Sequence, residues 1–300
     1  MNALDLTIID QLTNGRLGVL DAACPQCGPE RRRPINQRKP VLRIWRPEPH
    51  FASYNCTRCG LKGHARDDST ASRDTAAIER AKAEAAERDR IGKAERLSKA
   101  QWIWSRSRPL IGTIAERYLL SARGYDGPLP ATLRFLPPRG DHGPAMLAAF
   151  GMANEPEPGR IDIKPDAIRG VHITRLAPDG SGKAGTDRDK IMIGLVTGSP
   201  IVLAPPNDLL GLAITEGIED ALSAHAATGL GAWAAGAASF LPALASAIPA
   251  YVEYITIIAD SDSDGERYAA ELASQLKQQS RAVRIVRFVP RVPATRSAAA

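Results

Sequence analysis

The stretch YITIIADSDSDGERYAAEL, residues 254–272, decides how the C-terminal part of this sequence folds. Its acids fit the spacing D-x-D-x-D-G-x5-E of a calcium-binding loop, with Asp260, Asp262 and Asp264 in the first acidic positions. A calcium loop of that kind follows a helix, whereas YITIIA is apolar and β-branched, which is typical of a strand. The stretch therefore predicts a strand, a turn and a helix, and not a calcium-binding hand.

The acids of this stretch have another use at the end of a strand. Side chains two residues apart on an extended backbone point the same way, so Asp260 and Asp262 can bind one metal ion together. Asp264 is expected either to cap the following helix or to add a third oxygen ligand. Glu271 falls well inside the predicted helix and is expected to face solvent.

A second acidic motif, LAITEGIEDAL, covers residues 212–222. Glu216 ends a predicted strand, and Gly217 allows a ligand or a neighbouring backbone to come close. If a helix begins directly after Gly217, Asp220 faces the same cleft as Glu216, and Glu219 points elsewhere. The alternative for Asp220 is an acid of the first helical turn that the helix dipole favours.

Strands and helices alternate through the C-terminal part of the chain. The segments LGLAIT, LGAWAAG, YITIIA and AVRIVRF are strand-like, and IEDALSAHAAT, SFLPALASAI and GERYAAELASQLKQQ are helix-like. This order predicts an α/β fold with a parallel sheet and right-handed crossovers. Such sheets bind ligands beyond the carboxyl ends of their strands, which is where both acidic motifs lie.

The four cysteines form two pairs, CPQCG at residues 24–28 and CTRCG at residues 56–60. Four thiolates suit one tetrahedral, structural Zn²⁺, with Cys24, Cys27, Cys56 and Cys59 as its ligands. The 28 residues between the pairs leave room for a β-hairpin. The alternative is a set of buried free thiols.

The segment around the second cysteine pair is basic. Residues 28–66 contain ten Lys or Arg and two acids, and Trp45, Phe51 and Tyr54 are interleaved with the cations. Cations bind phosphates and flat rings stack on unpaired bases, so the segment is a candidate surface for single-stranded nucleic acid. One alternative is that the basic residues form a solvated face that binds no ligand. Another is that Trp45 and Phe51 pack in the core of the hairpin. The candidate binding residues are Arg43, Trp45, Tyr54, Arg58 and Lys62.

Composition sets wider limits. The 300 residues are 44% apolar, enough for several small cores, and the net charge is +6. The N-terminus lacks the basic and apolar segments of a signal peptide. Residues 221–252 contain no Asp, Glu, Lys or Arg, but Pro242 and Pro249 interrupt them, so we expect buried elements and no membrane span. CxxC pairs without an export signal indicate a reducing, cytoplasmic location.

These features predict a chain with several parts. The expected fold class is α/β, with an N-terminal zinc ribbon, a helical linker, a small mixed α/β subdomain and a C-terminal domain built on a parallel sheet. The expected boundaries are residues 1–68 for the ribbon, 69–104 for the linker, 105–205 for the subdomain, 206–289 for the C-terminal domain and 290–300 for a disordered tail.

The paired acidic motifs resemble the Toprim domain, which bacterial-type primases, topoisomerases and some nucleases share. Glu216-Gly217 and the pair Asp260 and Asp262 carry this resemblance. The two cysteine pairs resemble the zinc ribbon that precedes Toprim in primases of bacterial and bacteriophage type. The segments GTIAERYLLSARG and GVHITRLAPDGSGKA resemble the middle part of Toprim primases that phages and mobile elements carry.

The resemblance implies synthesis of short RNA primers from nucleoside triphosphates on a single-stranded DNA template. Glu216, Asp260 and Asp262 would bind catalytic Mg²⁺ or Mn²⁺, with Asp264 as a further ligand and Asp220 in support. Glu216 could instead act as a general acid or base. Basic residues of the middle region would bind nucleotide or template phosphates. The candidates by position are Arg175 and Lys190.

One departure from the resemblance concerns a second metal ion. Primases of this type usually carry another acidic pair after the last Toprim strand, but no acid follows Glu271 here. The sequence also contains no G-x4-G-K-[ST] motif, so a helicase would be supplied in trans. The alternatives are a Toprim nuclease that uses the same acids and a non-enzymatic, nucleic-acid-binding replication accessory with a degenerate site. For each of these we expect a bacterial cytoplasmic protein, encoded by a phage or mobile element in some cases.

Overall fold

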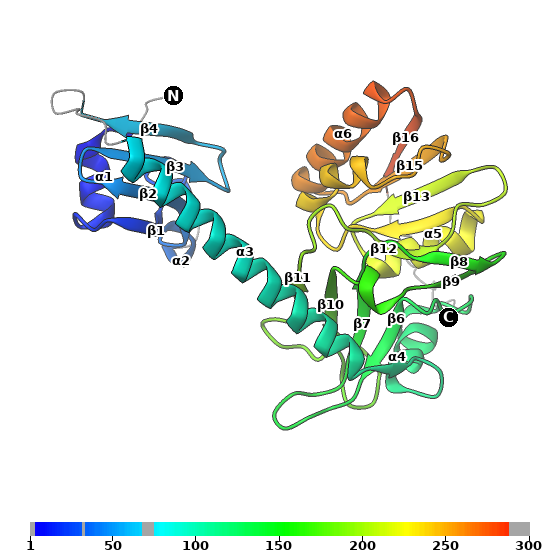
Figure 1. Cartoon of the computed structure of the whole chain (residues 1–300). Coiled ribbons are helices and arrows are strands. Elements are labelled where there is room, and N and C mark those ends of the chain that lie inside the picture. The colour runs from blue at the N-terminus through cyan, green and yellow to red at the C-terminus, as the bar shows by residue number, and fades with distance from the viewer. Residues whose placement is uncertain (1–3, 32–33, 68–74, 288–300) are drawn as a thin grey trace, which may run out of the picture. The chain divides into compact units, whose positions relative to one another are not determined.

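The computed structural model describes residues 4–31, 34–67 and 75–287 (Figure 1). The chain divides into two compact units, Met1–Arg90 and Ile91–Ala300. The expected tail, 290–300, and the start of the expected linker, 69–74, lie outside the described residues.

The first unit is built on an antiparallel sheet whose four strands follow one another in chain order. Helix α1 begins after Asp5, whose carboxylate accepts a hydrogen bond from the Ile8 backbone N–H, and it ends at Asn14 in a left-handed conformation. A buried apolar cluster joins α1 to the sheet. The elements are α1 (Leu6–Thr13), β1 (Gly18–Ala23), α2 (Pro34–Gln37), β2 (Pro40–Glu48), β3 (Phe51–Cys56) and β4 (Lys62–Arg66).

The expected helical linker forms α3 (Thr75–Ser105). Between residues 79 and 99 its side chains are mostly exposed, as its content of alanine and charged residues predicts. Its last turns bury Ala100, Ile103 and Trp104 against the sheet of the second unit. The helix therefore belongs to the second unit through its C-terminal end.

The middle region forms an antiparallel sheet of five strands in the order β11-β10-β7-β6-β5. The predicted helix at residue 113 begins as expected, because Thr113 caps its N-terminus. It continues as a π-helical turn, and Gly124 follows with a left-handed backbone. The elements are β5 (Arg108–Pro109), α4 (Ile114–Arg117), η2 (Tyr118–Ala122), β6 (Leu133–Leu136), β7 (Ala145–Phe150), β8 (Asn154–Glu157), β9 (Arg160–Asp162), η3 (Pro165–Ala167), β10 (Gly170–Arg175) and β11 (Lys190–Gly194).

The C-terminal sheet has the order β12-β14-β13-β15-β16, and β13 to β16 pair in parallel. This confirms the predicted α/β fold with a parallel sheet. The elements are β12 (Ile201–Ala204), β13 (Gly211–Thr215), α5 (Ile218–Thr228), β14 (Gly231–Ala234), η4 (Ala238–Phe240), η5 (Pro242–Ser246), β15 (Tyr254–Ala259), α6 (Ser263–Gln278) and β16 (Ala282–Arg287).

One expectation about this sheet needs correction, and one strand of it was not expected there. Strand β12 falls inside the expected middle region, 105–205, and pairs antiparallel with β14, so it extends the C-terminal sheet. The segment SFLPALASAI does not form an α-helix. It forms the two short 3-10 segments η4 and η5, because Pro242 has no N–H to continue the hydrogen-bond ladder.

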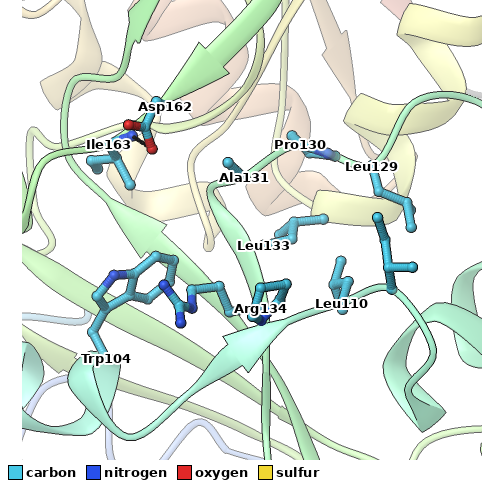
Figure 2. Close-up of a pocket in the computed structure, with 11 residues that line it drawn as sticks. Trp104, Leu110, Leu129, Pro130, Ala131, Leu133, Arg134, Asp162 and Ile163 are labelled. Atoms are coloured by element: carbon cyan, nitrogen blue, oxygen red, sulfur yellow. Dashed lines mark hydrogen bonds between the residues drawn. The ribbon is translucent and has the colours of Figure 1, made fainter.

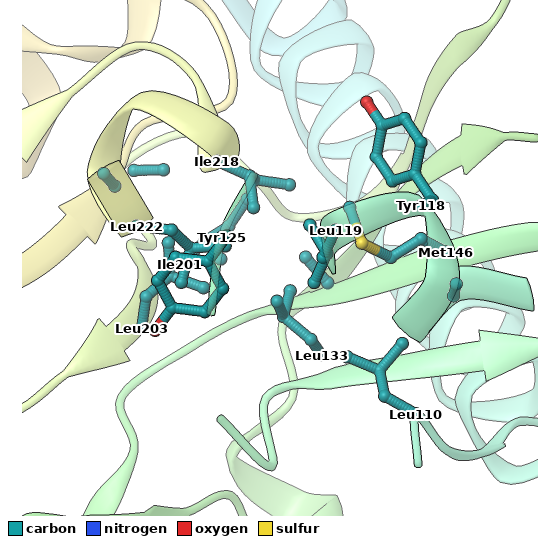
Figure 3. Close-up of a cluster of buried hydrophobic side chains, with 14 of the residues drawn as sticks. Leu110, Tyr118, Leu119, Tyr125, Leu133, Met146, Ile201, Leu203, Ile218 and Leu222 are labelled. Atoms are coloured by element: carbon teal, nitrogen blue, oxygen red, sulfur yellow. The ribbon is translucent and has the colours of Figure 1, made fainter. Parts of the chain in front are cut away.

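The helices α5 and α6 cover opposite faces of the C-terminal sheet. Ala232 and Ala234 of β14 pack in one core with α5, whereas Trp233 packs in another with α6. The core on the α5 side also contains side chains of β6, β7 and η2, including Leu133, Met146 and Leu119 (Figure 3). The two sheets of the second unit thus share one apolar core.

No helix in the described part of the chain is long and apolar enough to cross a membrane. The uncharged stretch 221–252 divides into α5, β14, η4 and η5, as expected for buried elements.

Candidate metal-dependent active site

The two acidic motifs meet at one edge of the C-terminal sheet. Strands β13 and β15 are parallel neighbours, and Thr215 pairs with Ile258. Glu216 therefore leaves β13 beside the point where Asp260 leaves β15. This is the carboxyl edge of the sheet, where ligands bind in folds of this kind.

A glycine brings each acidic motif close to the backbone. A β-carbon on Gly217 would overlap the carboxylate of Asp220, one turn further along the chain. A β-carbon on Gly265 would lie 2.8 Å from the Asp260 carbonyl oxygen and 3.1 Å from Asp262 Oδ1. A side chain at position 265 would therefore clash with backbone, whereas one at position 217 would displace the end of the Asp220 side chain. The predicted close approach of a ligand or a neighbouring backbone to Gly217 is not among these contacts.

The helix cap after β15 is Asp262 and not Asp264. Asp262 Oδ1 accepts a hydrogen bond of 2.7 Å from the Gly265 backbone N–H, which begins α6. Asp264 lies in the first turn, 71% exposed, and forms an ion pair of 2.9 Å with Arg267. An acid held by a cation at the surface is a poorer metal ligand than its neighbours, so the structure favours Asp260 and Asp262 over Asp264.

The pKa of Glu216 shows how the acids affect one another. Burial raises its pKa, and the negative charges of Asp260 and Asp262 raise it further. The Lys190 ammonium and a hydrogen bond from the Ala238 backbone N–H act in the opposite direction. The charges of Asp260 and Asp262 therefore repel the ionised carboxylate of Glu216, and a bound divalent cation would offset that repulsion.

Some of the same charges act on Asp220. Burial raises its pKa, as do the charges of Asp260 and Glu219, whereas Lys190 and Lys183 lower it. The charge of Asp260 thus acts on both Glu216 and Asp220 at this edge of the sheet. Among the described residues, no three of the acids Glu216, Asp220, Asp260 and Asp262 have carboxylate oxygens that all lie within 4.8 Å of one another. Carboxylate oxygens are the ligands that Mg²⁺ and Mn²⁺ prefer, so the residue types suit either ion.

Glu219 lies next to this group and has partners that its sequence does not reveal. Its Oε1 accepts a hydrogen bond of 2.6 Å from the Tyr118 hydroxyl and lies 3.3 Å from Lys183 Nζ. Burial raises its pKa, but the Tyr118 hydroxyl and the Lys183 charge lower it to about 2. No periodicity or spacing connects residues 118, 183 and 219, so sequence patterns could not have found this contact.

The two candidate phosphate-binding residues of the middle region lie on different faces of its sheet. Lys190 pairs with Thr174 and so shares a face with Thr174 and His172. Arg175, the next residue of β10, points to the other face. The charge of Lys190 acts on Glu216 and Asp220, whereas Arg175 contributes to no pKa shift described for these acids.

In the first unit, the four cysteines converge. Their sulfur atoms all lie within 4.8 Å of one another, and the pairs Cys24–Cys59 and Cys27–Cys56 are 3.8 Å apart. A tetrahedral site with Zn–S bonds of about 2.3 Å has sulfur–sulfur edges of about 3.8 Å. Within residues 4–31, 34–67 and 75–287, the four cysteines are the one group of three or more His, Cys, Asp or Glu residues whose ligand atoms all lie within 4.8 Å of one another. The geometry fits the predicted zinc site.

The local chain holds these thiols in place. Gly28 packs against the Cys24 carbonyl and Gly60 has a φ of +73°, so each pair ends in a tight turn. Burial raises the pKa of the Cys56 thiol, but the backbone N–H groups of Cys59 and Arg58 outweigh it, and the pKa falls to about 7. Burial and the other thiols raise the pKa of Cys27 to about 12.

The candidate nucleic-acid residues of the first unit do not share one environment. Tyr54 is 2% exposed, and its hydroxyl accepts a hydrogen bond of 2.9 Å from the Leu4 backbone N–H. Its expected role in base stacking is therefore wrong, because its ring lies in the core. Arg43 is exposed but forms a two-bond ion pair with Asp21. Arg58 is half-buried and donates to the Asn36 carbonyl at 3.4 Å.

Trp45 and Lys62 lie on the exposed face of the same sheet. Along β2 the side chains alternate, with Leu42 and Ile44 buried and Trp45 37% exposed. Phe51, half-buried, stacks on His64 with ring centres 6.3 Å apart. Of the predicted residues of the first unit, Trp45 and Lys62 are the two that are exposed and have no ion pair in the described structure.

A separate cavity of about 230 Å³ lies between the end of α3, β6 and the loop at residues 129–131 (Figure 2). Arg134 lines it, with its guanidinium 5.3 Å from the centre of the Trp104 ring. Figure 2 shows Trp104 and Asp162 toward one end and Leu110 and Leu129 toward the other. None of the predicted acids lines this cavity, so it is not the candidate active site.

Comparison with known families agrees with the strand-end geometry. Residues 211–293 match the family model of the Toprim domain (Toprim_3). Residues 94–203 match a family model described as a domain of unknown function (DUF7146). Searches of curated proteins and of solved structures gave no significant match.

The C-terminal domain is therefore a Toprim domain, a class typical of metal-dependent enzymes that transfer nucleotidyl groups or cleave nucleic acids. The whole chain is a multidomain α/β protein with a four-cysteine cluster, a connecting helix, a DUF7146 region and this Toprim domain.

Proposed function

We propose that the protein is a primase-like nucleotidyltransferase that makes short RNA primers on single-stranded DNA. The observation that supports the proposal is that β13 and β15 are parallel neighbours in a Toprim sheet and lead at its carboxyl edge to Glu216 and to Asp260 and Asp262, with the charges of Lys190 and Lys183 acting on the acids there. Acids that bind a divalent ion, faced by cations that bind phosphate, suit a reaction of nucleoside triphosphates.

The acids have distinct roles in this proposal. Asp260, Asp262 and Glu216 would hold Mg²⁺ or Mn²⁺, which, when bound, neutralises phosphate charge and makes the primer 3′-hydroxyl more acidic. The 3′-oxygen would form a bond to the α-phosphorus, the bond from the α-phosphorus to pyrophosphate would break, and the hydroxyl proton would pass to Glu216 or to water. Burial and the aspartates raise the pKa of Glu216, which is the direction that a proton acceptor requires.

The first unit would bind the template. A structural Zn²⁺ on the four cysteines would fix the turns that flank β2 and β3. The accessible Trp45 ring would stack on an unpaired base, and Lys62 would contact phosphate. We infer a cytoplasmic site of action, because thiols persist as metal ligands in reducing compartments. We also infer that a partner protein supplies the helicase.

Incubation with single-stranded DNA, labelled nucleoside triphosphates and Mg²⁺ or Mn²⁺ tests the proposal. We expect new short RNA that the double substitution Asp260→Asn and Asp262→Asn removes. Primer synthesis by the folded double variant would refute the assignment of these acids.

A Toprim nuclease is the second candidate, since the Toprim domain is typical of metal-dependent nucleases as well as of nucleotidyl-transfer enzymes and the same acids would serve either reaction. Shortened DNA without new RNA in the same assay would favour the nuclease. A third possibility is a non-enzymatic replication accessory. It predicts that the double variant retains biological function.

A further inference from the structure

The carboxylate of Glu219 is buried beside the candidate active site without belonging to the metal-binding set. Its side chain is 18% exposed, and the side chain of its partner Lys183 is 26% exposed. A carboxylate in such a place is costly unless cations or hydrogen-bond donors surround it. The Tyr118 hydroxyl and the Lys183 ammonium serve that purpose, at 2.6 and 3.3 Å.

The two side chains that contact the Glu219 carboxylate in the described structure, Tyr118 and Lys183, both come from the DUF7146 region. Tyr118 opens the π-helical turn η2, and its hydroxyl accepts a further hydrogen bond of 2.8 Å from Arg123 Nε. Figure 3 shows this hydroxyl pointing away from the apolar cluster that contains the base of the ring. The hydrogen bond from Tyr118 to Glu219 therefore connects α5, the helix that also carries Asp220, to the DUF7146 region.

Lys183 is held by its backbone as well as by Glu219. It forms a bridge with Leu176, and the Ala184 backbone N–H donates to the Arg175 carbonyl at 3.0 Å. Asp189 accepts hydrogen bonds from the backbone N–H groups of Gly185 and Thr186, at 3.0 and 2.8 Å, and so closes the turn after Lys183. An ammonium group has three donors, and Glu219 uses one of them.

We propose that Glu219 is a positioning residue that holds the Lys183 ammonium near Asp220, the next residue of α5, where Lys183 binds the triphosphate of a nucleotide. The inference deepens the proposed function and rests on it for the identity of the ligand. It gives the DUF7146 region a definite task, which is to supply the cation that faces the Toprim acids. A lysine fixed in advance loses less conformational freedom when the phosphate binds.

A double-mutant cycle on the full-length protein tests this inference. The substitutions are Lys183→Ala, Glu219→Gln and both together, and calorimetry measures the affinity for a non-hydrolysable nucleoside triphosphate with Mg²⁺. We expect each single substitution to weaken binding roughly tenfold, as for a hydrogen bond to a charged group. Because Glu219 acts through Lys183, the double variant should bind no more weakly than Lys183→Ala. Lys183→Arg should restore most of the affinity.

Matched controls are Glu271→Gln and Lys277→Ala, exposed residues of α6 without an ion pair in the described structure. If Glu219→Gln does not fold, Glu219→Asp keeps the charge but withdraws it by one methylene, and it should give the same non-additivity.

Additive losses, or a lower melting temperature with unchanged affinity, would overturn the inference, and so would absence of triphosphate binding by the unsubstituted protein. Primer synthesis is measured separately, as kcat and KM. Coupled triphosphate binding without any RNA product would remove the proposed polymerisation and leave the role of Glu219 standing.

Discussion

The Asp220 carboxylate occupies the space where a β-carbon of residue 217 would stand, so a side chain at Gly217 would have to displace it. This contact holds Asp220 near the strand end that carries Glu216, although the two residues are four positions apart. The glycine of the EG pair therefore allows this position of Asp220.

Gly217→Ala should displace Asp220 and lower metal-dependent activity by on the order of 100-fold, since small displacements in an active site have effects of that size. The measurement is kcat for primer synthesis, together with a melting curve. Gly143→Ala is the matched control, because a β-carbon there meets no atom within 4 Å. Equal activity of the two variants would contradict the packing argument.

Substitutions of the three aspartates that follow β15, Asp260, Asp262 and Asp264, should have unequal effects. Asp260→Asn and Asp262→Asn each remove a charge from the group near Glu216, and Asn at position 262 can still cap α6. Both should nearly abolish activity with little loss of stability. Asp264→Asn breaks only the surface pair with Arg267 and should leave activity within about twofold, as surface pairs contribute little. A large loss from Asp264→Asn would return that residue to the metal site.

The cysteine cluster should bind one zinc ion per chain. Cys56→Ser should remove the ion and destabilise the first unit, because a structural zinc contributes directly to folding. Elemental analysis of carefully prepared protein gives the zinc content, and Ser53→Ala on the same strand is the control. Absence of zinc from the unsubstituted protein would reject the site.

Substitutions of Trp45 and Tyr54 should distinguish a residue that binds nucleic acid from a residue that stabilises the first unit. Trp45→Ala should weaken binding of single-stranded DNA about tenfold, as for loss of one stacked base, with no loss of zinc. Tyr54→Phe removes the acceptor for the Leu4 N–H and should lower stability by roughly 1 kcal/mol without changing affinity. Fluorescence anisotropy and urea unfolding measure these effects, and the reverse pattern would restore Tyr54 as a binding residue.

His172 should make the protein sensitive to mild acid. Burial lowers the pKa of this side chain to about 4, as do the charges of Lys190 and Lys183, whereas Glu219 acts in the opposite direction. The unfolded chain, with a pKa near 6.5, binds the proton first, so stability is full above pH 6.5 and falls as the pH drops toward 4. The loss amounts to at most about 3 kcal/mol.

Urea unfolding at several pH values between 7 and 4 measures that dependence. The variant His172→Asn should lose most of the extra slope in this window. An unchanged slope would show that other groups cause the acid sensitivity.

The sequence predicted the structure correctly where the prediction depended on one short segment alone. The alternation of YITIIA with a polar, helix-forming segment fixes the strand that carries Asp260, and a strand end followed by glycine fixes Glu216. The cysteine pairs similarly indicate their own site. At the cap of α6, two aspartates with similar capping propensity compete, and the sequence did not distinguish Asp262 from Asp264.

The sequence by itself determined the parallel sheet, the two acidic strand ends and the four-cysteine cluster, because periodicity and local spacing encode them. Only the tertiary structure decided that Tyr54 is buried, that β12 completes the C-terminal sheet, and that Tyr118 and Lys183 reach Glu219. Those outcomes depend on how distant segments pack around shared apolar cores. Packing is a property of the whole fold, and no short stretch of sequence contains it.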